Sequence, residues 1–296
     1  MRACLSILRP GNCLMSVAAA LVGSFLILKT LSPISIIAAA VVFVITGSGN
    51  VINDYVDIEA DRINRPKRPI PSGKIKPKAA LLYSAALFIF GISLSALTTP
   101  AAFLIAVFNT LLLVLYSSRL KNKIYIGNAV VSYLVGSTIL FGAASVAGAQ
   151  LHLLVLPSFL MLLSGLSNFS REIIKTLEDL EGDKFAFIKK IVKAAKQKVL
   201  EKFRLEKGEV KTNFNKSLAR KAAAVSLFLV IIISPIPYIY GSLGIGYMIF
   251  LAPTLLVFLK SAAMILSKKR NYSSISKLIK TGMLLGLFAY VVGMLF

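Results

Sequence analysis

The sequence is poor in the residue types on which many soluble enzymes depend. Its 296 residues include one histidine, two cysteines and 12 acidic residues, and only 16% of the residues are charged. Soluble domains have roughly 25% charged and 45–50% apolar residues, whereas this chain is 57% hydrophobic and has a mean hydropathy of +0.80. The shortage of charge excludes an ordinary soluble domain, and the abundance of apolar residues excludes intrinsic disorder.

The shortage of histidine and cysteine excludes several kinds of site. His152 is expected on the outer side of the membrane, away from the acidic residues, so a histidine-based metal centre or a Ser-His-Asp triad has no supply of residues. Cys4 and Cys13 are too few for a disulfide framework. The sequence also lacks a CxxC pair, an HExxH motif and a glycine-rich phosphate loop. Chemistry must therefore come from the acidic residues and the basic surplus.

Long apolar runs recur along the whole chain. A helix needs about 20 mostly apolar residues to cross a bilayer, and nine segments meet this requirement. The expected spans are 11–28, 34–53, 79–98, 101–117, 125–147, 151–170, 221–240, 243–266 and 278–296. We therefore expect one polytopic, all-α membrane domain over residues 1–296.

Basic residues are concentrated on one side of this topology. The chain carries 34 Lys and Arg and a net charge of +22, and all of these residues except Lys29 and Lys260 belong to the N-terminus and the connections on its side. Basic loops remain in the cytoplasm, so we expect a multi-pass cell-membrane protein with a cytoplasmic N-terminus. Because topology accounts for much of the surplus, no nucleic-acid partner is implied.

All 12 acidic residues lie in two windows, 54–61 and 172–209, which begin at the cytoplasmic ends of spans 2 and 6. In each window, oxygen-bearing side chains repeat every four residues and so share one face of a helix. Oxygen ligands of this kind suit Mg²⁺. Two clusters with matching spacing at membrane depth favour a metal site over solvated helix ends. The repeating positions are Asp57 and Asp61 in the first window, with Asn53 one turn before Asp57, and Asp179 and Asp183 in the second, with Lys175 one turn earlier.

A proline-rich basic loop follows the first window. Residues 62–74 contain three prolines and five basic residues, among them Arg62, Arg65 and Arg68. Arginine binds phosphate oxygens in bidentate fashion. Arginines beside a magnesium site are what a diphosphate requires, so these three residues predict diphosphate binding.

These motifs together resemble those of the UbiA superfamily of intramembrane prenyltransferases. The resemblance rests on NDxxDxxxD at 53–61, RxNRPxRPIPSG at 62–73 and DxxxD at 179–183, and it covers most of the chain. Within the superfamily, RPxN at 9–12, GNxxVS at 127–132 and SREI at 170–173 are most similar to archaeal digeranylgeranylglyceryl phosphate synthases.

The resemblance implies a central cavity open to the cytoplasmic side and two Mg²⁺ ions. It implies transfer of geranylgeranyl from its diphosphate to the hydroxyl of geranylgeranylglyceryl phosphate, a lipid phosphate acceptor, beside membrane lipid. Asp57, Asp61, Asp179 and Asp183 would be catalytic metal ligands, with Asn53 as a further ligand. The expected diphosphate contacts are Arg62, Arg65, Arg68, Lys121 and Lys175, and the expected acceptor contacts are Arg9, Asn12, Tyr116 and Asn168.

The sequence departs from the family pattern in two places. Tyr116 and Lys121 are one residue further apart than the commoner Tyr-x-x-x-Lys spacing. Residues 184–220 form a long lysine-rich connection in which apolar residues between 188 and 203 recur at helical spacing. That pattern predicts a basic amphipathic helix. The helix either lies on an anionic membrane or caps the site, or it packs on neighbouring loops.

Two other functions are compatible with part of the pattern. An aromatic acceptor, as in quinone biosynthesis, would keep the fold and the donor. A cation transporter would need polar residues in both leaflets, and the outer halves of the spans contain almost none.

Overall fold

The computed structural model describes the backbone of residues 2–121, 123–196, 215–267 and 271–296, and their side chains except at residues 2, 63, 64 and 181–196. These parts are helical and contain no strand. Nine of the described helices are long and apolar enough to cross a membrane, which confirms the expected number of spans. In chain order the elements are α1 (Arg2–Ile7), α2 (Pro10–Leu28), α3 (Pro33–Val56), α4 (Ile58–Asn64), α5 (Pro77–Ser95), α6 (Pro100–Leu115), the π-helix η1 (Tyr116–Leu120), α7 (Ile124–Ala147), the 3₁₀-helix η2 (Leu151–Leu154), α8 (Val155–Lys196), α9 (Lys216–Ile233), α10 (Ile236–Ile239), α11 (Ile245–Leu266) and α12 (Tyr272–Leu295).

Local signals define where the helices begin. Proline occupies the first turn of α2, α3, α5 and α6, where its missing N–H costs nothing. Ser32 and Ser35 form a reciprocal capping box at α3. The hydroxyl of Thr99 accepts the Ala102 N–H at 3.2 Å at the start of α6. These signals explain why the expected starts of these spans lie within two residues of the observed ones.

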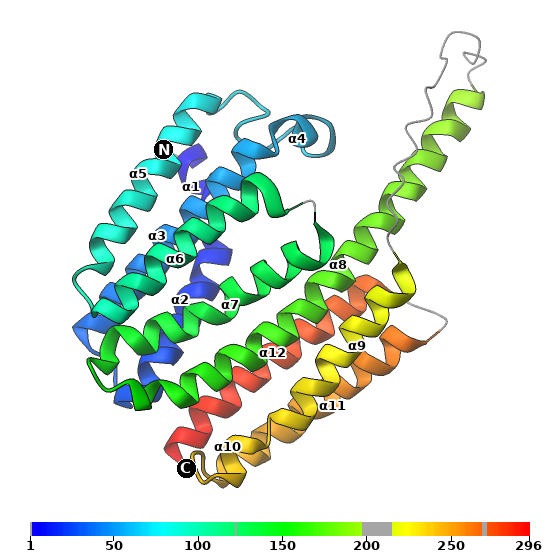
Figure 1. The fold of residues 1–296 in the computed structure, drawn as a ribbon. Coiled ribbons are helices and arrows are strands. Elements are labelled where there is room, and N and C mark those ends of the chain that lie inside the picture. Colours follow the sequence, from blue (N-terminus) through cyan, green and yellow to red (C-terminus); the bar gives the residue numbers. More distant parts are fainter. Residues whose placement is uncertain (1, 122, 197–214, 268–270) are drawn as a thin grey trace.

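The helices form two groups that lie side by side (Figure 1). One buried apolar cluster joins α2, α3, α5, α6 and α7. Another joins α8, α9, α11 and α12, and Leu26 of α2 and Ile139 of α7 reach it from the first group. The interior of the protein therefore lies between an N-terminal and a C-terminal group of helices.

α2 and α7 cross with their backbones nearly in contact. A Cβ added to Gly23 would lie 1.9 Å from the carbonyl oxygen of Ile139, and one added to Gly142 would lie 1.9 Å from that of Ala20. The hydroxyl of Ser24 donates to the carbonyl oxygen of Gly142 at 2.8 Å. Small residues and a buried hydrogen bond are the usual means of joining helices in lipid. This crossing fixes the position of α2, which carries Asn12.

Two helices extend further than expected. α8 continues from span 6 to Lys196, so the helix expected after residue 188 is a direct continuation of that span and projects beyond the bundle (Figure 1). The rest of that expected helix, residues 197–203, lies outside the described residues. α12 begins at Tyr272, six residues before the expected start, and thereby adds Lys277 to the helix that carries Lys280.

Candidate active site

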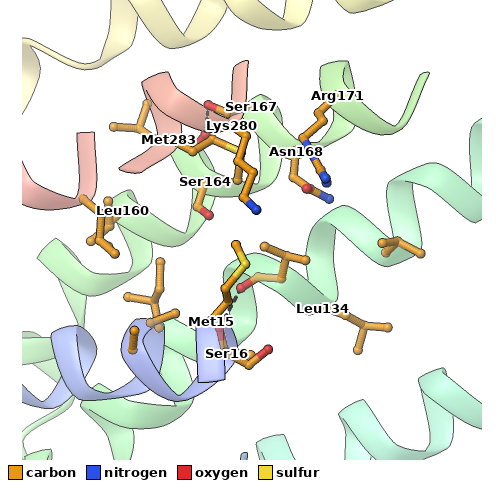
Figure 2. A pocket seen from close by; sticks show the side chains of 18 of the residues that line it. Met15, Ser16, Leu134, Leu160, Ser164, Ser167, Asn168, Arg171, Lys280 and Met283 are labelled. Atoms are coloured by element: carbon orange, nitrogen blue, oxygen red, sulfur yellow. Dashed lines mark hydrogen bonds between the residues drawn. The ribbon is translucent and has the colours of Figure 1, made fainter. Parts of the chain in front are cut away.

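A cavity of about 530 Å³ lies between the two groups of helices. Much of its lining is apolar, including Val41, Ile45, Leu163 and Phe258. In the part shown in Figure 2, Met15 and Leu134 face Ser164 and Asn168. The cavity therefore combines an apolar interior with polar groups. Its amide and phenol side chains include Asn12, Asn50, Asn53, Asn109, Tyr116 and Asn168.

The first acidic motif keeps a helical repeat although α3 ends at Val56. The N–H of Asp57 donates to the carbonyl oxygen of Asn53 at 3.0 Å, and the N–H of Asp61 donates to that of Asp57 at 2.8 Å. The four-residue hydrogen-bond pattern thus continues into α4. Asn53, Asp57 and Asp61 lie along one side of this helical path, and Asn53 lines the cavity.

A buried network of ion pairs surrounds Asp54. Arg9 and Arg68 both bind the Asp54 carboxylate, which is only 3% exposed, and Arg68 also binds Asp61. Arg9 lies between α1 and α2 with φ of 54°, a left-handed conformation that is uncommon for residues other than glycine. The network ties the N-terminal segment and the proline-rich loop to the first acidic motif.

A π-turn brings Lys121 to the same motif. The N–H of Lys121 donates to the carbonyl oxygen of Tyr116, five residues earlier, at 3.0 Å. The extra residue between Tyr116 and Lys121 is accommodated by this wider turn. Lys121 forms an ion pair with Asp57, and the Ser117 hydroxyl donates to Asn53 Oδ1 at 2.7 Å. Segments 64 residues apart thus meet at the motif.

The second acidic motif lies on α8. Glu172 accepts hydrogen bonds from Arg171 at 2.9 Å and from Lys175 at 3.1 Å, and all three residues line the cavity. Asp179 follows one turn after Lys175 on the same helix and is exposed. The backbone of Asp183 belongs to α8, but its side chain lies outside the described residues.

The structure brings most, but not all, of the expected acceptor residues to the cavity. Asn12, Tyr116 and Asn168 line it, and the Asn168 amide lies 3.5 Å from the Ser132 hydroxyl. Arg9 does not line the cavity and is held by Asp54 instead.

Only some of the expected diphosphate contacts lie at the cavity or at the first acidic motif. Lys175 lines the cavity, and Arg68 and Lys121 bind the first motif. Arg62 is largely exposed and pairs with Glu59 on α4, and Arg65 is also exposed. The structure does not bring Arg62 or Arg65 to the cavity.

Several polar residues of the lining are additional to the expected site residues, among them Asn50, Arg171, Glu172 and Lys280. Arg171 and Glu172 belong to the SREI segment, so the sequence did contain a signal for them. Asn50 lies one turn before Asn53, on the same side of α3. Lys280 is also in the lining, and its signal in the sequence was a charged residue within the expected span 278–296.

The donor atoms of the two motifs are chemically suited to Mg²⁺. Asn53, Asp57, Asp61 and Asp179 offer hard oxygen ligands. Within the part of the chain that the structure describes, no three His, Cys, Asp or Glu side chains gather closely enough to hold a metal ion. The carboxylates of Asp57 and Asp61 are paired with Lys121 and Arg68 there. The ligand type fits the ion, and charges of both signs are concentrated beside the cavity.

The fold and this site define a polytopic membrane protein with a polar and apolar cavity beside paired acidic motifs. The model of the UbiA prenyltransferase family matches residues 13–288, so the chain belongs to that family. It is 35% identical over 295 residues to a digeranylgeranylglyceryl phosphate synthase of Methanopyrus kandleri, and the match covers all of both chains.

Solved structures agree with this assignment. A structure described as giving insights into digeranylgeranylglyceryl phosphate synthase in membranes has a TM-score of 0.79 and 35% identity, covering 99% of this chain and 98% of the other. A UbiA homolog from Archaeoglobus fulgidus, described as bound to GPP and Mg²⁺, has a TM-score of 0.62 and 16% identity, covering 98% and 99%. The second likeness concerns the fold alone.

Proposed function

We propose that the chain transfers a geranylgeranyl group from geranylgeranyl diphosphate to the free hydroxyl of geranylgeranylglyceryl phosphate. The product, digeranylgeranylglyceryl phosphate, is an archaeal ether lipid precursor. Full-length similarity to a relative named for this activity carries the proposal. We propose one catalytic domain over residues 1–296, of which the family model matches 13–288.

The cavity supports a reaction of this kind. Breaking the bond between the allylic carbon and the diphosphate oxygen leaves an allylic cation, which water would quench. An apolar lining that includes Val41, Ile45, Leu163 and Phe258 holds a long prenyl chain and excludes water. The electron pair of the broken bond departs with the diphosphate. The acceptor oxygen then forms the ether bond and releases its proton.

Basic side chains stabilise the charge that develops on the departing diphosphate. Preorganised cations do this without reorganisation at the moment of reaction. Arg68 and Lys121 are held at the first motif, and Lys175 lines the cavity on α8. Arg62 and Arg65 are proposed as further diphosphate contacts from the surface beside α4.

The two acidic motifs are proposed to hold the metal. Bound Mg²⁺ supplies Lewis-acid neutralisation of the diphosphate charge. Two ions are proposed because the family resemblance implies two ions between the motifs. The proposed ligands are Asn53, Asp57 and Asp61 on one side, and Asp179 and Asp183 on α8.

The acceptor lipid is proposed to lie against the polar part of the lining. Asn12, Tyr116 and Asn168 orient its head group by hydrogen bonding. Arg9 is proposed to act from the edge of the site, where it also binds Asp54. The one-sided basic charge favours a cell-membrane protein with its N-terminus and its site on the cytoplasmic side.

A panel of acceptors tests the proposed reaction. Purified protein is incubated with geranylgeranyl diphosphate, Mg²⁺ and one acceptor at a time. The extracted lipid products are then identified by mass spectrometry. We expect product from geranylgeranylglyceryl phosphate and none from aromatic ring acceptors. Product from an aromatic acceptor alone would replace this proposal with a role in quinone biosynthesis.

A further inference from the structure

Lys280 is a basic residue within an apolar membrane-spanning helix. It is the ninth residue of α12 and lines the cavity. Charged side chains at such positions are costly and are usually retained for function. Among the described residues, its ammonium group has no ion pair or hydrogen bond. The position therefore holds a charge that none of the described side chains compensates.

The other basic residues of the lining differ from Lys280 in this respect. Arg171 and Lys175 share the carboxylate of Glu172. Figure 2 shows Lys280 extending from α12 into the space toward which Ser164, Asn168 and Arg171 project from α8. The Nε atom of Arg171 is buried and has no hydrogen-bond partner in the described part of the chain. Neutral polar groups and an unused guanidinium donor thus face the uncompensated ammonium group.

This part of the lining is distinct from the first acidic motif. Asp57 and Asp61 have their own cations, Lys121 directly after η1 and Arg68 in the proline-rich loop. Lys280 and Arg171 come from α12 and α8. The reaction proposed above has two phosphate-bearing substrates, and only the diphosphate requires the acidic motifs with their metal. A separate group of cations suits the second phosphate.

We propose that Lys280, together with Arg171, binds the phosphate monoester of the acceptor lipid. The inference rests on the proposed function for the identity of that lipid. An ammonium and a guanidinium group give charge-assisted hydrogen bonds to a phosphate dianion. Ser164 and Asn168 supply further hydrogen-bonding groups. The same arrangement discriminates against neutral acceptors, because they would leave Lys280 unpaired in a largely apolar cavity.

Binding measurements on purified protein without turnover test this inference. Lys280→Gln is compared with the wild type and with Lys277→Gln, a matched control because Lys277 is exposed and lies three residues earlier on α12. The probes are geranylgeranylglyceryl phosphate, the same lipid without its phosphate, and geranylgeranyl diphosphate. We expect Lys280→Gln to weaken binding of the phosphorylated acceptor by on the order of tenfold, and to leave the other two probes unchanged. Lys280→Arg should retain binding, and Lys277→Gln should resemble the wild type with every probe.

The outcomes separate this inference from the proposed function. An equal loss for both acceptor lipids, or a loss for the diphosphate donor, would overturn the role of Lys280. So would a wild-type protein that binds the two acceptor lipids equally well. If the wild type binds the phosphorylated lipid through Lys280 but forms no product with the donor, the proposed reaction fails and the phosphate site stands.

Discussion

At the scale of single residues, Asp57 is bound by Lys121 and occupies the centre of the first motif. We expect Asp57→Ala to lower transfer activity by on the order of 100-fold or more, because a group that organises transition-state charge is lost. Folding should persist, since the Asp57 side chain is partly exposed. Product formation and the thermal unfolding temperature, measured on the same preparation, check this prediction. Glu59→Ala on α4 is the control, because Glu59 is 83% exposed. Full activity in Asp57→Ala would remove the metal assignment from this motif.

Asp54 lies near Asp57 in the same motif but differs from it in function, because its carboxylate binds Arg9 and Arg68 and is not a proposed metal ligand. Asp54→Asn removes the charge that Arg9 and Arg68 share, while Arg68 keeps Asp61. We expect a loss of about 1–3 kcal/mol in the free energy of unfolding, the usual cost of a buried polar group left without its partner.

Unfolding of Asp54→Asn in detergent measures this loss. The exposed pair of Glu59 and Arg62 gives the comparison, since breaking an exposed pair costs about 1 kcal/mol or less. Equal stability of Asp54→Asn and Glu59→Gln would show that the buried network contributes nothing.

At the scale of elements, the π-turn at η1 accommodates the extra residue between Tyr116 and Lys121, so that Lys121 still reaches Asp57. Deleting Ser118, an exposed residue of η1, restores the commoner Tyr-x-x-x-Lys spacing and should convert the π-turn into an α-turn. We expect this variant to retain transfer activity, because Lys121 still reaches Asp57. Deleting Leu111, an exposed residue in the second half of α6, is the control. It rotates η1 by about a third of a turn relative to the rest of α6 and should abolish activity. Loss of activity in the Ser118 deletion alone would show that the wider turn itself is needed.

The helices and the facing positions of the acidic motifs could be predicted from the sequence, because both depend on local patterns. Apolar run length predicts a span, and a four-residue spacing predicts a shared helical face. The partners of the motifs could not be predicted in this way. The contact between Asp57 and Lys121 joins residues 64 positions apart, and it depends on how α3 and α6 pack. Lys280 lies at the start of the expected span 278–296, and apolar run length does not reveal that its side chain lines the cavity.

At the scale of the whole molecule, the proposed orientation can be measured directly. Single cysteines are introduced at Ser72, in the proline-rich loop, and at Gln150, in the short connection before η2, in a background without Cys4 and Cys13. Both positions are exposed. We expect a membrane-impermeant thiol reagent to label Gln150→Cys in intact cells and Ser72→Cys only after the membrane is opened, because basic loops remain inside. The reverse pattern would place the site on the outer side.

The cavity is shared between the two groups of helices, and this has a consequence for biosynthesis. Asn12 at the start of α2 and Tyr290 near the end of α12 belong to one lining. A ribosome that inserts the chain from its N-terminus produces the first acidic motif long before the last wall of the cavity exists. Every shorter insertion intermediate exposes that motif without an enclosed chamber. The cavity can shelter a substrate from water only after the final span has entered the bilayer. Transfer activity therefore requires the completed polypeptide.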